Sequence, residues 1–426
     1  MKNTSLAVIG GLAILVVIGL GASWRPSIAP IEPPNPASFS AEAIARGQQL
    51  AALGDCAVCH TRDGGALLSG GRAMLTPFGT LYSTNLTPAP RTGIGTWSFE
   101  AFQRAMREGI SREGNHLYPA FPYTAFTRVG DEDLRDLYAY LMSRPAIEAE
   151  SPANRLRFPY NQRSILAGWN FLFLDEGPFR PQPQRDAAWN RGAYLVEGLG
   201  HCSACHSPRT ALGSERTGRQ RFAGATVDGW QVPALNGSSK PAIPWTQATL
   251  YEYLRNGFSR YHGAAAGPMA PVATGLARQP DADLQAMARY LATFLPEQGS
   301  DFSPQQQAVE LEQRTYGTLE PVSGSGGRIF TGACMACHHD GDGPRLNGVR
   351  PSLAVSSNLY AATPDNLLKV VLDGIGHPAR PELGYMPAFR HSLNNQQIVA
   401  LVRYLREDFA GLPAWPDLEF KVARLR

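Results

Sequence analysis

The sequence predicts an all-α protein of three tandem helical domains with long loops, preceded by one N-terminal transmembrane or signal helix. Three observations support this fold class. An opening helix, a Cys pair and a closing amphipathic helix recur three times within the 426 residues. The 43 Gly and 34 Pro residues favour short helices joined by turn-rich loops. An uncharged, mostly apolar run follows Lys2.

The totals limit the possible functions. A chain of this length suits two to four domains, and the 43% hydrophobic content lets each domain bury a core. The formal net charge is only +3, and basic and acidic residues are well mixed along the chain. No basic stripe is present of the kind that nucleic acid binding requires, so we expect no nucleic acid partner.

The apolar run covers residues 6–23. It is near the lower limit for a spanning helix and is longer than most signal-peptide cores. Cleavage after Ala22 or Ser23 is the alternative, although the neighbouring residues suit it poorly. We expect residues 1–25 to form a single uncleaved anchor in the inner membrane, with the rest of the chain on the periplasmic side. Trp24 would then lie at the bilayer interface.

The repeats predict where the domains begin and end. We expect three domains at residues 38–150, 185–297 and 320–412. The remaining segments are a Pro-rich spacer at 26–37, linkers at 151–184 and 298–319, and a tail at 413–426. The first linker contains the aromatic run WNFLFL, which we expect to pack on a domain.

In each copy we expect the opening and closing helices to cross at a glycine, because a missing side chain allows close backbone approach. A tyrosine of the closing helix would pack beside each crossing. The glycines are Gly47, Gly192 and Gly327, and the tyrosines are Tyr140, Tyr290 and Tyr404. The alternative is that these are ordinary core tyrosines of unrelated helices.

All six cysteines occur in C-x-x-C pairs, and a histidine follows each pair directly. The pairs are Cys56 and Cys59, Cys202 and Cys205, and Cys334 and Cys337, followed by His60, His206 and His338. No cysteine is left over for an ordinary disulfide.

The spacing of these residues matches the chemistry of covalent haem. Haem c is bonded through two thioethers, and two Cys on one helical turn reach both of its vinyl groups. The following His lies under the ring and binds iron. A zinc site or a redox dithiol are the alternatives, but three motifs do not pair evenly into four-ligand sites, and a dithiol needs no adjacent His. The motifs therefore predict three heme c groups, one in each of three cytochrome c domains.

The sixth iron ligand is normally a Met on the loop ahead of the closing helix, where a thioether raises the reduction potential. The second copy offers Met269 and the third offers Met386 at this place. The first copy has Phe121 there, and Phe cannot ligate iron. His116, Met106, or an open or otherwise ligated iron are the alternatives for the first haem.

Four longer motifs resemble a known family, the triple-haem cytochrome c subunits of bacterial membrane-bound dehydrogenases. The first is TPFGTLYSTNLTPAPRTGIGTWSFEAF at residues 76–102. The others are LYPAFPY at 117–123, GPMAPV at 267–272 and MPAF at 386–389. The resemblance covers nearly the whole exported chain. It implies an electron-transfer subunit that takes electrons from a catalytic dehydrogenase subunit and passes them to ubiquinone or a terminal oxidase.

The resemblance is closest to the branch that serves molybdenum hydroxylases, which oxidise aldehydes or N-heteroaromatic compounds such as nicotinate. WRPSIAPIEPP at residues 24–34 and HLYPAFPY at 116–123 are similar to that branch. The implied partner carries molybdopterin, with a possible small iron–sulfur subunit. The alternative is the cytochrome subunit of a quinoprotein alcohol dehydrogenase or of a flavin-dependent gluconate, sorbitol or fructose dehydrogenase.

An electron-transfer subunit needs no catalytic residue, and we expect this chain not to oxidise the substrate itself. Two other classes of function remain as alternatives. A self-sufficient haem enzyme such as a peroxidase would need an open iron, which Phe121 could leave at the first haem. A soluble periplasmic shuttle would need the N-terminal segment to be cleaved.

Overall fold

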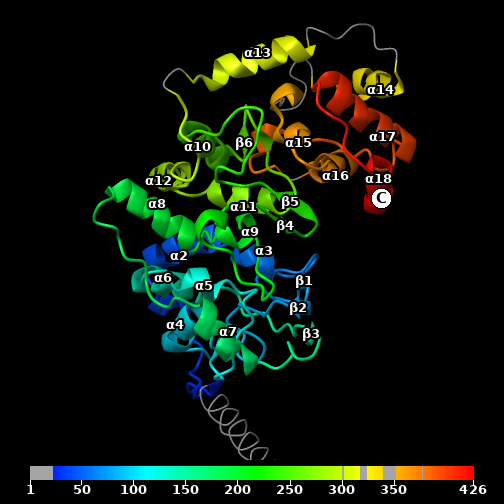
Figure 1. Ribbon diagram of the computed structural model, residues 1–426. Coiled ribbons are helices and arrows are strands. Elements are labelled where there is room, and N and C mark those ends of the chain that lie inside the picture. The colour runs from blue at the N-terminus through cyan, green and yellow to red at the C-terminus, as the bar shows by residue number, and fades with distance from the viewer. Residues whose placement is uncertain (1–22, 300–301, 317–323, 339–351, 377) are drawn as a thin grey trace, which may run out of the picture. The chain divides into compact units, whose positions relative to one another are not determined.

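A computed structural model describes residues 23–299, 302–316, 324–338, 352–376 and 378–426 (Figure 1). The chain divides into two compact units. The first unit comprises residues 1–183 and 194–201, and the second comprises residues 184–193 and 202–426. The predicted N-terminal helix lies almost entirely outside the described residues. Within the described ranges, no helix has both the length and the apolar character that crossing a membrane demands.

The first unit is rich in short helices, several of which begin at polar N-caps. The Ser40 side chain accepts the N–H of Ala43 at the start of α2, and Ser98 caps α4 in the same way. Its elements are η1 (Pro36–Ser38), α2 (Ala41–Leu53), α3 (Cys56–His60), β1 (Ala73–Thr76), β2 (Gly79–Tyr82), α4 (Phe99–Glu108), α5 (Tyr123–Phe126), α6 (Asp131–Met142), β3 (Arg155–Leu156) and α7 (Ile165–Phe173).

Helix α8 (Ala187–Glu197) contributes residues to both units. The second unit continues with α9 (Ser203–His206), η2 (Gly218–Gln220), β4 (Ala225–Val227), β5 (Trp230–Val232), α10 (Gln247–Asn256), β6 (Phe258–Ser259), β7 (Gly263–Ala264), α11 (Met269–Leu276), α12 (Asp281–Ala292) and α13 (Pro304–Tyr316). It ends with α14 (Ser325–Ala333), η3 (Leu353–Val355), α15 (Ser357–Tyr360), α16 (Asp365–Asp373), η4 (Pro381–Leu383), α17 (Asn395–Tyr404), the π-helical turn η5 (Leu405–Phe409) and α18 (Leu418–Leu425).

The fold is helix-rich, as predicted, but it is not purely α-helical. Strands β1, β2 and β3 form one antiparallel sheet, in which Ala73 pairs with Tyr82 and Gly79 with Leu156. Strands β4 and β5 form a hairpin, and β6 and β7 form another. These strands were not predicted, because segments of two to four residues are too short to show the alternating pattern of a strand.

The opening and closing helices cross at a glycine in three places. A side-chain carbon at Gly47 would overlap the carbonyl oxygen of Asp136 and the Cβ of Tyr140. The same relation links Gly192 with Ala286 and Tyr290, and Gly326 with Ala400 and Tyr404. The predicted tyrosines are confirmed. In the third crossing, however, the glycine is Gly326 rather than the expected Gly327, because two adjacent glycines look alike in sequence and only the helix rotation selects one.

Polar residues stand at the start of each closing helix. Helix α6 begins with Asp131, and α12 begins with Asp281, which places carboxylates in the first turn. Asn394 accepts the N–H of Gln397, and the Gln397 side chain accepts the N–H of Asn394, so α17 begins with a capping box.

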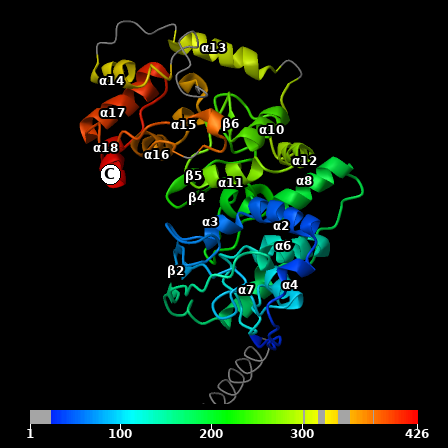
Figure 2. The same ribbon diagram turned by 180° about the vertical axis from the view of Figure 1, so that it is seen from behind.

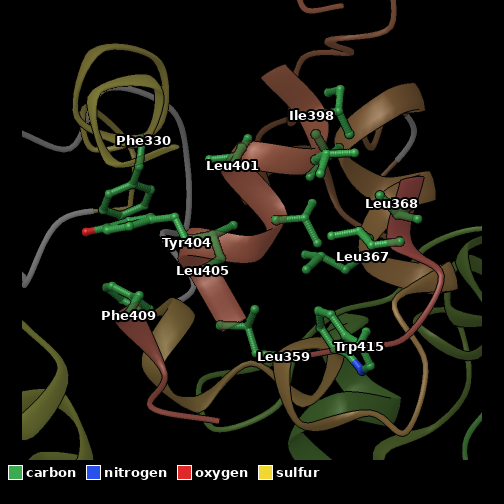
Figure 3. Close-up of a cluster of buried hydrophobic side chains, with 14 of the residues drawn as sticks. Phe330, Leu359, Leu367, Leu368, Ile398, Leu401, Tyr404, Leu405, Phe409 and Trp415 are labelled. Atoms are coloured by element: carbon green, nitrogen blue, oxygen red, sulfur yellow. The ribbon is translucent and has the colours of Figure 1, made fainter. Parts of the chain in front are cut away.

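A large apolar cluster fills the C-terminal part of the second unit (Figure 3). The Phe330 ring lies 5.7 Å from the Tyr404 ring and 5.4 Å from the Phe409 ring, measured between centroids. Tyr316 of α13 lies 5.1 Å from Phe409. The predicted tail adds Trp415, which donates a hydrogen bond to the carbonyl of Ala361. The tail is therefore part of this core.

The crossings predict a specific response to substitution. We expect Gly326→Ala to destabilise the C-terminal part by about 1–3 kcal/mol or more, because the new methyl group must displace the backbone of α17. The matched control is Gly332→Ala in the same helix, where no atom lies within 4 Å of the new methyl group. This control is expected to stabilise slightly or to have no effect. Thermal unfolding followed by circular dichroism compares the two variants, and equal melting curves would contradict the crossing.

Candidate haem sites

Each Cys pair lies on a single helical turn with its histidine. Helix α3 contains Cys56, Cys59 and His60. The His206 N–H donates to the carbonyl of Cys202, and the His338 N–H donates to the carbonyl of Cys334, each at 2.9 Å. These are the backbone hydrogen bonds of a helix, so the two thiols and the imidazole project from one short turn. No disulfide joins any of the six cysteines.

The imidazole rings of two motif histidines are oriented by backbone carbonyls. His60 Nδ1 lies 2.6 Å from the Thr84 oxygen, and His206 Nδ1 lies 2.8 Å from the Pro233 oxygen. A carbonyl oxygen can only accept, so each Nδ1 carries the proton and donates it. Each Nε2 therefore keeps its lone pair for a metal, and the hydrogen bond holds the ring in one orientation.

The electrostatic surroundings favour the form that binds iron. Burial lowers the pKa of both His60 and His206, which keeps their rings neutral. Burial also raises the pKa of the Cys56 thiol to about 12 and that of Cys334 to about 11. Such thiols are protonated at neutral pH, unlike the low-pKa thiolate of a redox dithiol.

Sequence reasoning missed the two acceptor carbonyls, Thr84 and Pro233. Both follow a short hairpin: Thr84 comes two residues after β2, and Pro233 comes directly after β5. A backbone carbonyl carries no residue signature, and its position depends on how the hairpin folds back. The repeated turn-rich stretch after each motif was the only available signal.

The third motif is described only in part. Residues 339–351, which follow His338, lie outside the described ranges. The Tyr316 hydroxyl donates to the His338 carbonyl at 3.1 Å, which ties this motif to α13.

The residues fit the donor set of a covalent haem. In the described part of the chain, no group of three or more His, Cys, Asp or Glu side chains is arranged to hold a metal ion by itself. Each motif instead presents two thiols and one imidazole on one turn, with the imidazole fixed through Nδ1 in two of them. Such a site could bond the two vinyl groups of a haem and would supply one imidazole nitrogen to the iron that the porphyrin holds.

The structure brings Met269 close to the hairpin that orients His206. Met269 is the first residue of α11, and Gly267 lies just before it in the left-handed conformation, with φ 55°. A side-chain carbon at Gly267 would overlap the Trp230 ring. Trp230 begins β5, which leads directly to Pro233. The loop before Met269 therefore packs, through Gly267 and Trp230, against the β4–β5 hairpin that orients His206.

Met386 lies in an isolated antiparallel β-bridge, whereas Met269 begins a helix. Met386 exchanges two backbone hydrogen bonds with Ile375, at 2.9 and 3.1 Å. Met386 and Cys334 both pack against the apolar cluster of the C-terminal part. The Met side and the Cys side of this candidate site thus adjoin one core.

Phe121, Met269 and Met386 occupy corresponding positions. Helices α4, α10 and α16 each end at a glycine with positive φ, namely Gly109 at 65°, Gly257 at 67° and Gly374 at 69°. Phe121, Met269 and Met386 each stand twelve residues after their glycine. This spacing identifies Phe121 as the counterpart of the two Met residues.

In the first unit, a cavity of about 440 Å³ lies beside Thr84, the residue whose carbonyl orients His60. Thr84 and Tyr118 both line it, together with Arg163. Thr84, whose carbonyl accepts the His60 hydrogen bond, and Tyr118, which precedes Phe121 in the same loop, therefore face one cavity.

His116 does not have a free imidazole. Its Nε2 lies 2.9 Å from the Ser23 carbonyl, to which it must donate, while Nδ1 is buried and has no hydrogen-bond partner. Only Nδ1 retains a lone pair. The Phe121 ring packs against Phe126, with centroids 5.4 Å apart. Met106 is a core residue of α4 with 4% exposure.

Comparisons with known proteins agree with this donor set. A family model described as "Cytochrome c" matches residues 44–145, and one described as "Cytochrome C oxidase, cbb3-type, subunit III" matches residues 323–405. Each matched range contains one of the Cys-pair motifs. Cytochrome c domains carry covalently bound haem c, so haem c is a cofactor of this chain.

Three curated relatives extend the match along the chain. The chain is 53% identical to a nicotinate dehydrogenase subunit of Pseudomonas putida over 99% of its own length, but it spans only 35% of that relative. It is 34% identical to the "Fructose dehydrogenase cytochrome subunit" of Gluconobacter japonicus, over 94% of this chain and 85% of the relative. It is 36% identical to the "Gluconate 2-dehydrogenase cytochrome c subunit" of Pantoea cypripedii, over 85% of each.

Proposed function

This chain belongs to the family of cytochrome c subunits of dehydrogenases, and on that premise we propose that it carries three covalent haems for electron transfer within a dehydrogenase complex. The observation that carries the proposal is the triple occurrence of two thiols and an imidazole on one helical turn. In two of these turns the imidazole Nε2 is free, because a backbone carbonyl holds Nδ1.

We assign the iron ligands from these positions. His60, His206 and His338 supply the proximal nitrogens, and the six motif cysteines supply the thioethers. Met269 and Met386 would supply thioether sulfur to the irons of the second and third haems. His116 is the proposed sixth ligand of the first haem through Nδ1, with Met106 or an open iron as alternatives. The bound haems provide the one-electron chemistry, and the chain contributes ligands, orientation and burial.

The proposed partner is a catalytic subunit of the molybdopterin type that oxidises an aldehyde or an N-heteroaromatic compound, with a possible small iron–sulfur subunit. The 53% identity to a nicotinate dehydrogenase subunit supports this choice over the alcohol, gluconate and fructose alternatives, whose relatives match at 32–36%. Ubiquinone or a terminal oxidase is the proposed acceptor. We place the chain on the periplasmic side of the inner membrane, held by its N-terminal segment.

The test of this function combines haem counting with partner-driven reduction. Mass spectrometry of the chain, matured in cells that attach haem c, is expected to show three added haem masses. The double variant Cys202→Ser/Cys205→Ser is expected to show two. In a complex with its catalytic subunit, nicotinate or an aldehyde should reduce the haems, whereas ethanol and gluconate should not. Fewer than three haem masses, or reduction by gluconate or ethanol alone, would contradict the respective part of the proposal.

The Met269 ligand can be tested through its supporting glycine. Gly267→Ala would force the new methyl group into the Trp230 ring and displace the Met269 loop. We expect the reduced variant to bind carbon monoxide at about one more haem than the parent, since a displaced thioether leaves iron open. Gly263→Ala is the matched control, because it also has positive φ but no neighbouring atom within 4 Å. Equal carbon monoxide binding by both variants would argue against Met269.

The first haem can be tested at Phe121. We expect Phe121→Met to raise the lowest of the three midpoint potentials by on the order of 100 mV, because a thioether replaces the native ligand. His116→Ala should open the same iron to carbon monoxide, while Met106→Leu should not. If His116→Ala leaves carbon monoxide binding unchanged, the assignment of His116 fails. Peroxide turnover by the parent protein would favour the haem-enzyme alternative.

A further inference from the structure

Helix α7 is attached to the first unit by one side. Leu166 is buried, and the Trp169 ring meets the Tyr123 ring edge-on at 6.2 Å. Asn170 accepts a hydrogen bond from the Tyr123 hydroxyl at 2.6 Å and donates one to the Glu108 carbonyl at 3.1 Å. These contacts fix how the helix is rotated, and they confirm in part that the WNFLFL run packs on a domain.

The opposite side of α7 is exposed and entirely apolar. Ile165 is 42% exposed, Phe171 88% and Leu172 63%. Ile165, Gly168 and Leu172 follow the three-and-four spacing of one helical face, and Phe171 lies beside them. Helix α7 contains no charged residue. An apolar face of this kind, presented by a helix whose rotation is fixed, marks an interaction surface.

The end of the predicted anchor is held beside this helix. Ser23 accepts the hydrogen bond from His116 Nε2, and the His116 carbonyl accepts one from Arg163 Nη1 at 2.6 Å. Arg163 stands two residues before the exposed Ile165. The point where the chain leaves the apolar run of residues 6–23 is therefore joined to the start of α7 through two hydrogen bonds.

Further contacts keep the following residues on the same surface. The Arg104 guanidinium donates to the Pro26 carbonyl at 2.8 Å, and the Ile28 N–H donates to the Arg112 carbonyl at 2.8 Å. Trp24 is 70% exposed at this exit. In both views of the ribbon, α7 lies beside α4, to which this segment is bound (Figures 1 and 2). The exit point thus has a defined place on the first unit.

We propose that the exposed face of α7 inserts into the interfacial layer of the bilayer from which the N-terminal segment emerges. The proposal rests on the membrane attachment stated under the proposed function. A lipid surface fits this face better than a protein does, because the face offers no charge or hydrogen-bonding side chain and lies beside the anchor exit. Trp24 supplies the aromatic ring that membrane interfaces favour.

The proposal has a consequence for the first haem site. Phe121 packs near Tyr123, at 6.2 Å between ring centroids, and Tyr123 packs on Trp169 of α7. Insertion of α7 would hold the distal loop of the first site against the membrane surface.

The test uses the full chain in vesicles of phosphatidylethanolamine and phosphatidylglycerol. All six native cysteines lie in haem motifs, so an added Cys is the only extra thiol. Phe171→Cys and Leu172→Cys would each carry a nitroxide label, and Leu75→Cys, at an 80% exposed apolar residue of β1, is the matched control. Relative to the control, we expect the labels on α7 to be about tenfold less accessible to a water-soluble nickel complex and more accessible to oxygen.

The possible outcomes distinguish the membrane attachment of the chain from the insertion of the α7 face. If the chain floats with the vesicles but the α7 labels stay accessible to nickel, the inserted face is wrong and the anchor remains. If the chain does not float, both the membrane attachment and the inserted face are wrong. If the labels become protected only when the catalytic subunits are added, α7 is a protein interface and the proposal is overturned.

Discussion

The close crossing of the opening and closing helices is the constraint on which the candidate sites depend. At each crossing the backbone of one helix touches the backbone of the other, which only a residue without a side chain permits. The Cys pair follows the opening helix, and the distal loop precedes the closing helix. Locking the two helices together therefore holds the two halves of each site within reach of one haem.

A second layer of control comes from the short hairpins. They add no large sheet, yet they carry the carbonyls of Thr84 and Pro233 to the Nδ1 atoms of the motif histidines. The hairpin that holds Pro233 also presents Trp230 to the glycine before Met269. The β4–β5 hairpin thus contacts both His206 and the loop before Met269. A change in its packing would therefore move both of these parts of the second site.

The first site differs from the other two in its chemistry rather than in its framework. Its crossing, its Cys turn and its His60 hydrogen bond are formed as in the second site. At the distal position, however, Phe121 offers an aromatic ring in place of sulfur, and the nearby His116 is tied to the Ser23 carbonyl. The same histidine also links Ser23 to Arg163, two residues before α7, so the proposed ligand of the first haem and the proposed membrane attachment share residues.

Local patterns were enough to predict the cofactor, the motif residues and the main helices. C-x-x-C-H encodes its chemistry within five consecutive residues, and amphipathic helices reveal themselves by their period. The division into three domains stays a prediction, as do the N-terminal helix and the iron ligands. The sequence by itself determined the kind of cofactor and the opening and closing helices, because both depend on short-range spacing.

Tertiary structure decided the rest. It selected Gly326 over Gly327, placed the Thr84 and Pro233 carbonyls, and turned one face of α7 outward while the other packed on Tyr123. Each of these depends on contacts between residues far apart in the chain. Such contacts are fixed only when the whole backbone folds back on itself, and single-residue preferences do not record them.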